Sequence, residues 1–302
     1  MGQKRVLVTR EPEQFKAILA TKFDSFGHCP QWHKLWRPFL GDGIFATDGQ
    51  QLQHRRWMVR PMVVKNRLSN LILFGAYANK LLSKLLAQAA TVDLKDPFYR
   101  WALGTTTDFL LPVAPLIPKG DYYRAIRKME ESMEPFLAGA IALVESELEK
   151  LSQSDMQFTI ARISKDPKTI RDQVMSVLLA GRDTTAATMS WAMYGISNYP
   201  AAWARVRREV FDVLGPNEKP TYEALEDLKY VKNVIDKTMR LLPAVLVNMR
   251  QALETTTIPG APGERDIVLL QGDRVTINTL GMHARRDLYP RRRRFADPAI
   301  YL

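Results

Sequence analysis

The chain has 302 residues, with 43 Lys and Arg against 32 Asp and Glu, and its formal charge is +11. Hydrophobic residues make up 46% and charged residues 25%, a globular balance that excludes disordered and collagen-like classes. The single cysteine, Cys29, excludes a disulfide framework and multi-cysteine metal sites, and four His argue against a His-rich metal cluster.

The first half of the chain is expected to be mostly helical. A short helix is predicted over 11–21, followed by a loop that contains Gly27, Pro30, Pro38, Gly41 and Gly43. Apolar residues then recur at three- and four-residue spacing, which is typical of helices that bury one face. The predicted helices are 50–58, 68–90, 97–111 and, after a proline-rich turn, 122–151.

A long helix is predicted in the second half. Asp166-Pro167 is a typical helix start, because proline is favoured at the first helical position. No further proline occurs before Pro200, so we expect a helix of about 30 residues and about 45 Å.

Shorter elements follow this long helix. Helices are expected over 201–214, 222–226 and 229–242. Alternating and β-branched residues over 245–253 and 266–278 then predict a small sheet. The chain is therefore expected to be a single, mainly helical domain over 1–302 with a minor β-element.

The sequence also bears on membranes and nucleic acids. No stretch reaches the roughly 18 consecutive apolar residues that span a bilayer, so a soluble, cytoplasmic protein is expected. Four consecutive arginines, Arg291–Arg294, carry part of the basic excess, and no aromatic residues are interleaved for base stacking. We interpret them as a solvated or partner-facing patch, with no nucleic-acid partner.

One motif in the predicted long helix stands out chemically: Ala180-Gly181-Arg182-Asp183-Thr184-Thr185. Glycine inside a helix costs about 1 kcal/mol relative to alanine, and a threonine hydroxyl can bond to a carbonyl one turn earlier and bend the helix. An acid beside an alcohol at such a weakened point suits proton delivery to a small ligand. Close packing over Gly181, with the threonine bound to its own backbone, is the structural alternative.

This motif is similar to the central-helix signature of the cytochrome P450 enzymes, the haem-thiolate monooxygenases. Other segments resemble the fungal branch that hydroxylates n-alkanes and fatty acids, in the same order from about Glu11 to Tyr289. The resemblance implies a mainly α, P450-like fold with a small sheet. The segments are 41–45, 54–61, 107–110, 240–243, 247–250 and 282–289.

The resemblance implies roles for six residues. Asp183 and Thr184 would be the catalytic pair that delivers protons to dioxygen, and Gly181 would open the helix for it. His54, Arg56 and Arg250 would reach the haem propionates, where an arginine–carboxylate contact is chemically suitable. From the residue alone, His54 is equally compatible with an ordinary surface histidine.

The chain departs from the family at several points. The iron-ligating Cys loop that the family carries near its C-terminus is not found in these residues, and neither an N-terminal membrane anchor nor the first strands are expected. Lys237 replaces the family's glutamate three residues before Arg240, which makes a like-charge pair on one helix face. Leu52 replaces a tryptophan that would help to hold a propionate, and the stretch 111–122 is short.

The resemblance implies a monooxygenase that hydroxylates a hydrophobic small molecule, with electrons from NADPH-cytochrome P450 reductase at the endoplasmic reticulum membrane. The departures predict that this chain, as given, is an incomplete and inactive form. The alternative function is that of a non-catalytic pseudoenzyme or fragment that binds a partner or lipid. The resemblance also places Arg240 in the structural ion-pair helix behind the haem. A solvated charge on an exposed helix face is the alternative for this residue.

Overall fold

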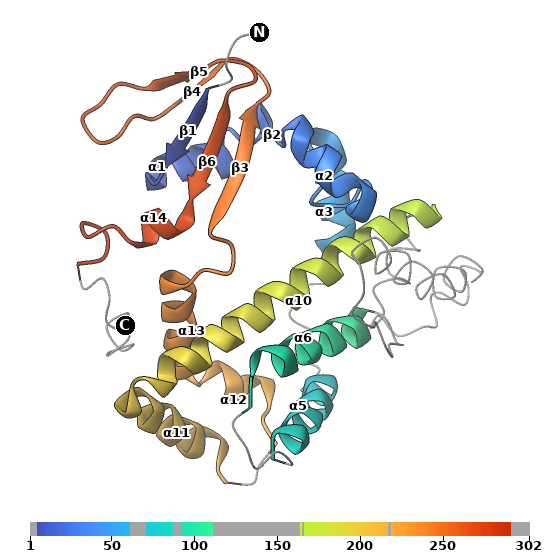
Figure 1. Cartoon of the computed structure of the whole chain (residues 1–302), viewed down its shortest axis with the longest axis vertical. Helices are drawn as coiled ribbons and strands as arrows, with labels where there is room; N and C mark the ends of the chain where they lie inside the picture. The colour runs from blue at the N-terminus through green and yellow to red at the C-terminus, as the bar shows by residue number, and fades with distance from the viewer. Residues whose placement is uncertain are drawn as a thin grey trace. The chain divides into compact units, whose positions relative to one another are not determined.

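A computed structural model describes residues 5–60, 71–86, 92–110, 164, 166–216 and 219–290. Helices dominate these residues, and two small sheets accompany them, which confirms the mainly α fold class (Figure 1). The chain divides into two compact units. We call residues 35–187 and 220–222 the helix unit, and residues 1–34, 188–219 and 223–302 the sheet unit.

A four-stranded sheet of order β1-β6-β3-β2 organises the sheet unit. Strand β1 (Val6–Thr9) runs parallel to β6 (Arg274–Asn278), whereas β3 (Val247–Ala252) is antiparallel to both β6 and β2 (Phe26–Gly27). The strands predicted over 245–253 and 266–278 are therefore confirmed, with β3 and β6 in this sheet. A second, two-stranded sheet pairs β4 (Thr256–Ile258) with β5 (Ile267–Leu269).

The core of the sheet unit lies between these strands and the first helix. Helix α1 (Pro12–Lys16) continues as a π-helical segment over Ala17–Thr21, so the predicted helix at 11–21 is confirmed. Ile18 and Val275 are fully buried there, and Ile277 is 1% exposed. Burying each of these β-branched side chains contributes about 1.5–3 kcal/mol to folding.

A second group of helices completes the sheet unit. The helices α11 (Pro200–Leu214), α12 (Tyr222–Glu226) and α13 (Lys229–Leu241) match their predicted ranges closely. Glu209 accepts hydrogen bonds from the backbone nitrogens of Tyr230 and Val231, at 2.7 and 2.9 Å. An acidic group at a helix N-terminus is stabilising, so Glu209 ties α11 to the start of α13. A short helix, α14 (Thr279–His283), follows β6.

The helix unit contains α3 (Gly49–Val59), α5 (Leu71–Leu86) and α6 (Lys95–Leu110), which confirms the helices predicted there. The longest element, α10 (Pro167–Ser197), has 31 residues and starts at the proline that the sequence indicated. Its first part, as far as Ala187, belongs to the helix unit. Ile170, Val174 and Met175 on α10 are fully buried.

Two expectations about the N-terminal part are wrong. Residues 30–40 form helix α2 (Pro30–Leu40) rather than a loop. A proline lacks the N–H that is unsatisfied in a first turn anyway, so Pro30 fits the start, and Pro38 lies only two residues from the end. Strands β1 and β2 are also present. The predicted turn and helix at 111–151 and the Arg291–Arg294 run lie outside the described residues.

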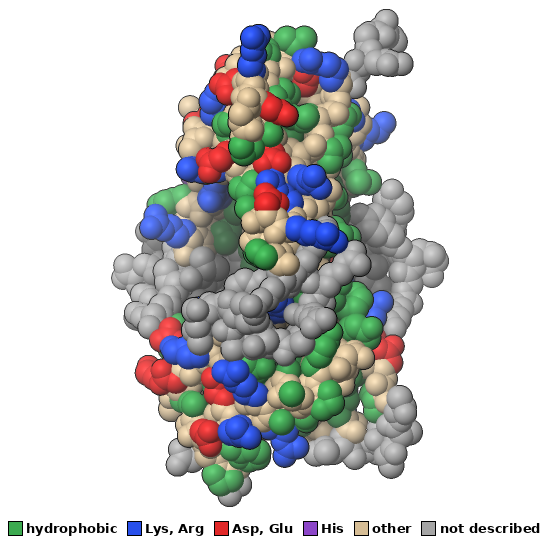
Figure 2. All heavy atoms as spheres, turned by 90° about the vertical axis from the view of Figure 1, so that its left-hand side faces the viewer, with side chains coloured by type: hydrophobic (Ala, Val, Ile, Leu, Met, Phe, Trp, Pro, Cys, Tyr) green, Lys and Arg blue, Asp and Glu red, His purple; other side chains and the backbone are tan. Residues whose placement is uncertain are grey.

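No helix among the described residues is long and apolar enough to cross a membrane. On the face drawn in Figure 2, basic and acidic side chains are interspersed where the structure describes them. That mixture is typical of a solvated surface, and it does not form a single basic patch on the described part of this face.

Candidate functional site

The acid–alcohol pair lies in the interior of α10. The Thr184 hydroxyl donates a 2.6 Å hydrogen bond to the carbonyl of Ala180, one turn earlier. The Asp183 carboxylate lies 3.4 Å from Nε of Arg182, and 48% of its side chain is exposed. The guanidinium of Arg182 also lies over the ring of Tyr99, at 5.7 Å. The pair therefore combines an accessible carboxylate with a hydroxyl that is bound to the helix backbone.

Gly181 permits a close approach between α10 and α6. A Cβ atom added at Gly181 would lie 2.7 Å from both Cγ2 and Oγ1 of Thr106. Close packing over Gly181 was the structural alternative to proton delivery in the sequence analysis. The same alternative expected Thr184 to bond to its own helix backbone, as it does here. A role of Gly181 in admitting dioxygen stays a prediction.

Residues that the sequence did not single out fix the start of α10. The Asp172 carboxylate is fully buried and accepts hydrogen bonds from the backbone nitrogen of Asp42 (2.7 Å), Lys168 (2.9 Å) and Arg171 (2.7 Å). A Cβ at Gly41 would lie 2.1 Å from this carboxylate, and φ of Gly41 is +55°. Glycine is therefore required at this turn for both conformational and steric reasons.

Arg55 on α3 joins the same cluster. Its Nε donates to the carbonyl of Asp42 at 3.1 Å, and its Nη1 donates to the hydroxyl of Thr169 at 3.2 Å. Lys168 forms a 2.5 Å ion pair with Asp42, and its hydrogen bond is the main reason why the pKa of Asp42 is lowered. The Gly41–Gly43 turn, α3 and α10 are thus held together by charged groups. The i,i+4 pair of Lys168 and Asp172 was the local signal for this cluster.

Two of the predicted propionate donors lie on α3. His54 and Arg56 are both exposed, and the His54 ring stacks on Trp57 with 6.0 Å between centroids. Residues two apart on a helix project about 200° apart, so the two side chains leave α3 in different directions. Leu52, in the tryptophan position, is 8% exposed and packs as a core residue.

The third predicted donor, Arg250, lies on β3 in the sheet unit. Its Nη1 donates to Oδ1 of Asn248 at 2.6 Å and to the carbonyl of Met249 at 2.9 Å. The same atom lies 3.2 Å from Nε2 of His28, whose ring stacks on Trp32. Arg250 is therefore oriented by its own strand and by the segment after β2.

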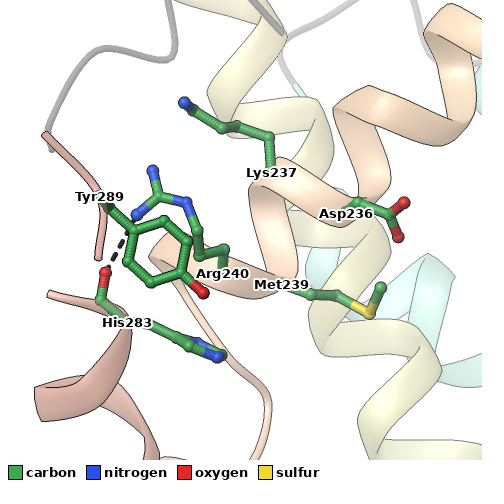
Figure 3. Close-up of a pocket in the computed structure, with 6 residues that line it drawn as sticks. All are labelled: Asp236, Lys237, Met239, Arg240, His283 and Tyr289. Atoms are coloured by element: carbon green, nitrogen blue, oxygen red, sulfur yellow. Dashed lines mark hydrogen bonds between the residues drawn. The ribbon is translucent and has the colours of Figure 1, made fainter. Parts of the chain in front are cut away.

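Lys237 and Arg240 line a pocket of about 370 Å³ beside α13 (Figure 3). Both are buried, at 3% and 7% exposure, so Arg240 is not a solvated surface charge. Its Nη1 donates to the carbonyl of His283 at 3.0 Å, and its guanidinium lies 4.8 Å from the ring of Tyr289. Burial, together with the Arg240 charge, lowers the pKa of His283.

Two further lining residues, Asp236 and Met239, also come from α13. Asp236 points away from both cations (Figure 3). Met239 is 40% exposed.

The described residues fit a haem group only in part. Arg56 and Arg250 have the chemistry to bind propionates, because guanidinium groups pair with carboxylates. Cys29, the one cysteine of the 302 residues, is buried, and its carbonyl accepts from the backbone nitrogen of Trp32 at the start of α2. The Cys29 thiol is therefore not accessible to a large planar group such as haem. No group of three His, Cys, Asp or Glu residues in the described ranges is placed to hold a metal.

Comparison with known proteins gives consistent matches. The family model described as "Cytochrome P450" matches residues 104–297. A protein named cytochrome P450 monooxygenase pvhE, from Talaromyces variabilis, is 34% identical, and the match covers 99% of this chain and 66% of the relative. Cytochrome P450 52A13 from Debaryomyces hansenii is 25% identical, and the match covers 94% of this chain and 65% of the relative.

A further relative, cytochrome P450 52A1 from Candida tropicalis, is 27% identical, with 94% of this chain and 62% of the relative covered. The chain thus spans just under two thirds of the length of these relatives. The match to the Talaromyces protein runs over 354 positions, more than the 302 residues of this chain, so the relative carries additional internal residues.

Proposed function

Because the chain belongs to the cytochrome P450 family, we propose that the whole protein is a monooxygenase that hydroxylates alkyl chains, such as n-alkanes or fatty acids. The observation that carries the proposal is the Asp183–Thr184 pair inside the 31-residue helix α10. The motifs that resemble the fungal alkane and fatty-acid branch support the substrate class. The fungal origin of the three relatives is consistent with it.

Haem, the family's cofactor, supplies the iron at which dioxygen is activated. In this proposal the N–H groups of Arg56 and Arg250 bind the propionates, with His54 as a further donor. Thr184 and Asp183 hold and pass on a proton, because a hydroxyl and an exposed carboxylate can exchange protons with water. Gly181 lets α10 approach its neighbour closely beside them.

We further propose that the 302 residues by themselves form no thiolate–iron bond, because Cys29 is buried at the start of α2. A non-catalytic role in binding a partner or lipid is the second candidate. The buried like-charge pair of Lys237 and Arg240 favours it, since the family motif places an acid at position 237.

The electron donor in the proposal is NADPH-cytochrome P450 reductase, and the site of action is the endoplasmic reticulum membrane. Both follow from the family resemblance of the whole protein. The mixed charge on the described face in Figure 2 is compatible with contact to the reductase and with contact to a membrane surface.

The test is an absorbance spectrum of the haem-loaded protein, reduced and exposed to carbon monoxide. For the whole protein we expect the red-shifted band of a thiolate ligand and hydroxylation of dodecane or lauric acid. For the 302-residue chain we expect no such band. A thiolate band from the 302-residue chain that disappears in Cys29→Ser would overturn the second proposal.

Two variants of the whole protein test the proton-delivery role. Thr184→Ala removes the hydroxyl, and we expect at least a tenfold loss of product formed per electron consumed, because proton transfer typically contributes 10² to 10⁴. Thr184→Ser keeps the hydroxyl and serves as the control. Equal coupling in both variants would contradict the assignment.

A further inference from the structure

Arg182 contacts the acid of the proposed proton-delivery pair. Its Nε atom lies 3.4 Å from Oδ1 of Asp183, the next residue on α10. Both atoms are buried, and neither has a hydrogen-bond partner among the described residues. The separation exceeds the roughly 2.7–3.2 Å of a normal N–H···O bond, so the contact is electrostatic. One oxygen of the Asp183 carboxylate is therefore directed toward a positive charge without being engaged in a hydrogen bond.

The guanidinium of Arg182 is also held from outside its own helix. Its central carbon lies 5.7 Å from the ring centroid of Tyr99 on α6. That distance is within the range of about 6 Å over which a cation is attracted to an aromatic ring. All three residues belong to the helix unit. Arg182 therefore connects a ring on α6 to the carboxylate on α10.

The packing of the two helices explains why Tyr99 is within reach. Tyr99 and Thr106 are seven residues apart, so they lie on nearly the same face of α6. Thr106 is the residue that a Cβ atom at Gly181 would meet at 2.7 Å, where α6 lies alongside α10 (Figure 1). The face of α6 that packs against Gly181 therefore also carries Tyr99.

These contacts contribute little to the stability of the fold. The side chains of Arg182 and Asp183 are 43% and 48% exposed. Ion pairs that are open to solvent are screened by water, and a cation–π contact at an exposed site is similarly weak. Their effect is therefore expected on the orientation of the carboxylate rather than on folding.

We propose that Arg182 and Tyr99 are positioning residues for Asp183. The ring of Tyr99 holds the guanidinium, and the guanidinium holds the carboxylate in one orientation beside Thr184. Because the contact is electrostatic, the carboxylate keeps its capacity to accept a proton, which a short bidentate pair with arginine would occupy. This inference rests on the proposed function, since it assigns the residues that orient the proton-delivering acid.

The coupling of the whole protein tests the inference. Tyr99→Leu removes the ring, and we expect product formed per electron consumed to fall about threefold or more, because a misplaced catalytic group loses rate. The KM for dodecane should stay within about twofold, since neither residue is assigned to the substrate. Tyr99→Phe keeps the ring and should restore the coupling, which distinguishes positioning by the ring from a role of the hydroxyl.

Arg182→Gln should lower the coupling as much as Tyr99→Leu, and it keeps the test open if the Tyr99 variant does not fold. Arg100→Gln is the matched control. Arg100 is an exposed arginine on α6 that pairs with Asp96 at 2.6 Å, so its loss should leave the coupling within about twofold.

A second readout uses the 302-residue chain and does not depend on activity. The Nε–H resonance of Arg182 in ¹H–¹⁵N spectra should carry a ring-current shift from Tyr99. We expect this shift to disappear in Tyr99→Leu and to persist in Tyr99→Phe. The same resonance position in all three chains would show that the ring does not hold the guanidinium.

The failure of this inference can be distinguished from the failure of the proposed function. If Thr184→Ala loses coupling whereas Tyr99→Leu and Arg182→Gln do not, the positioning role is overturned and proton delivery stands. If Thr184→Ala and Thr184→Ser are equally coupled, the proton-delivery role itself fails, and the positioning role fails with it. A change in the KM alone in the Tyr99 and Arg182 variants would also overturn the inference.

Discussion

The buried carboxylate of Asp172 accepts a 2.7 Å hydrogen bond from the backbone nitrogen of Asp42, 130 residues earlier in the chain. The same carboxylate is paired with Lys168 and Arg171. One side chain near the start of α10 therefore fixes the turn that precedes α3. This arrangement positions α3, which carries Arg56, relative to the helix that carries Asp183.

Replacing Asp172 with asparagine should strongly destabilise the chain. The change removes the buried carboxylate that pairs with Arg171, while Lys168 keeps its second partner, Asp42. Breaking a buried ion pair of this kind costs about 3–5 kcal/mol. The free energy of unfolding from urea titration is the measurement. Asp212→Asn, at an exposed position on α11, is the control and should change the stability by less than about 0.5 kcal/mol. Similar values for the two variants would contradict this role of Asp172.

Alanine at Gly181 should destabilise the contact between α10 and α6. Its Cβ would lie 2.7 Å from Thr106, and overpacking of this kind costs about 1–3 kcal/mol. Gly75→Ala on α5 is a matched control, because a Cβ there meets no atom within 4 Å. That control should gain up to about 1 kcal/mol from helix propensity. Thermal unfolding of both variants checks the prediction, and a gain of stability in Gly181→Ala would refute it.

Glutamate at position 237 should stabilise the chain. Lys237→Glu replaces a buried like-charge pair with an attractive pair on one face of α13. Interaction energies between contacting charged residues are about 0.5–3 kcal/mol, so the unfolding midpoint should rise by a few degrees. Differential scanning calorimetry measures this midpoint. A lower midpoint than that of the unmodified chain would show that Lys237 has a stabilising role of its own.

The stability should fall as the pH is lowered below about 6.5, through His283. Burial, and to a lesser extent the charge of Arg240, lowers the pKa of this imidazole in the folded chain. The unfolded chain then binds more protons between the folded pKa and about 6.5, so unfolding is favoured as the pH drops through that window. Urea midpoints at pH 7.5, 6.5 and 5.5 measure the slope.

His283→Gln should reduce the pH dependence of the urea midpoint between the folded pKa of His283 and about pH 6.5. At lower pH the variant should show the same dependence as the unmodified chain. The carboxyl pKa values of Asp42, Asp166 and Asp273 are lowered by hydrogen bonds from Lys168, Thr169 and Arg5 respectively. Their contribution is complete above about pH 4 and is lost only as the pH falls further, so they do not mask His283. An unchanged slope in the variant would exclude His283 as its source.

Local signals in the sequence predicted most helices but not the contacts between them. Asp166-Pro167 marked the start of α10 because its caps are local: Asp166 accepts bonds from both the backbone nitrogen and the hydroxyl of Thr169. Helix α2 was missed because Pro30 and Pro38 were interpreted as loop residues. Burial of Phe39 and Leu40 at its C-terminal end outweighs the hydrogen bond that Pro38 cannot make.

The site was predictable only where residues lie close in sequence. The Asp183–Thr184 pair is visible as a motif, whereas the partners of Asp172 are brought together by the tertiary fold. The burial of Lys237 likewise depends on packing around α13, which the sequence alone does not reveal.

The parallel pairing of β1 with β6 has a consequence for the order of folding. Arg5 and Asp273, which form an ion pair beside these strands, are separated by 268 positions. During synthesis, β1 therefore leaves the ribosome long before its partner exists. It must remain unpaired until nearly all of the described chain has been made, and contacts of such high sequence separation form slowly because a large loop must close first. The first strand of the described residues is thus among the last of them to form its pairing.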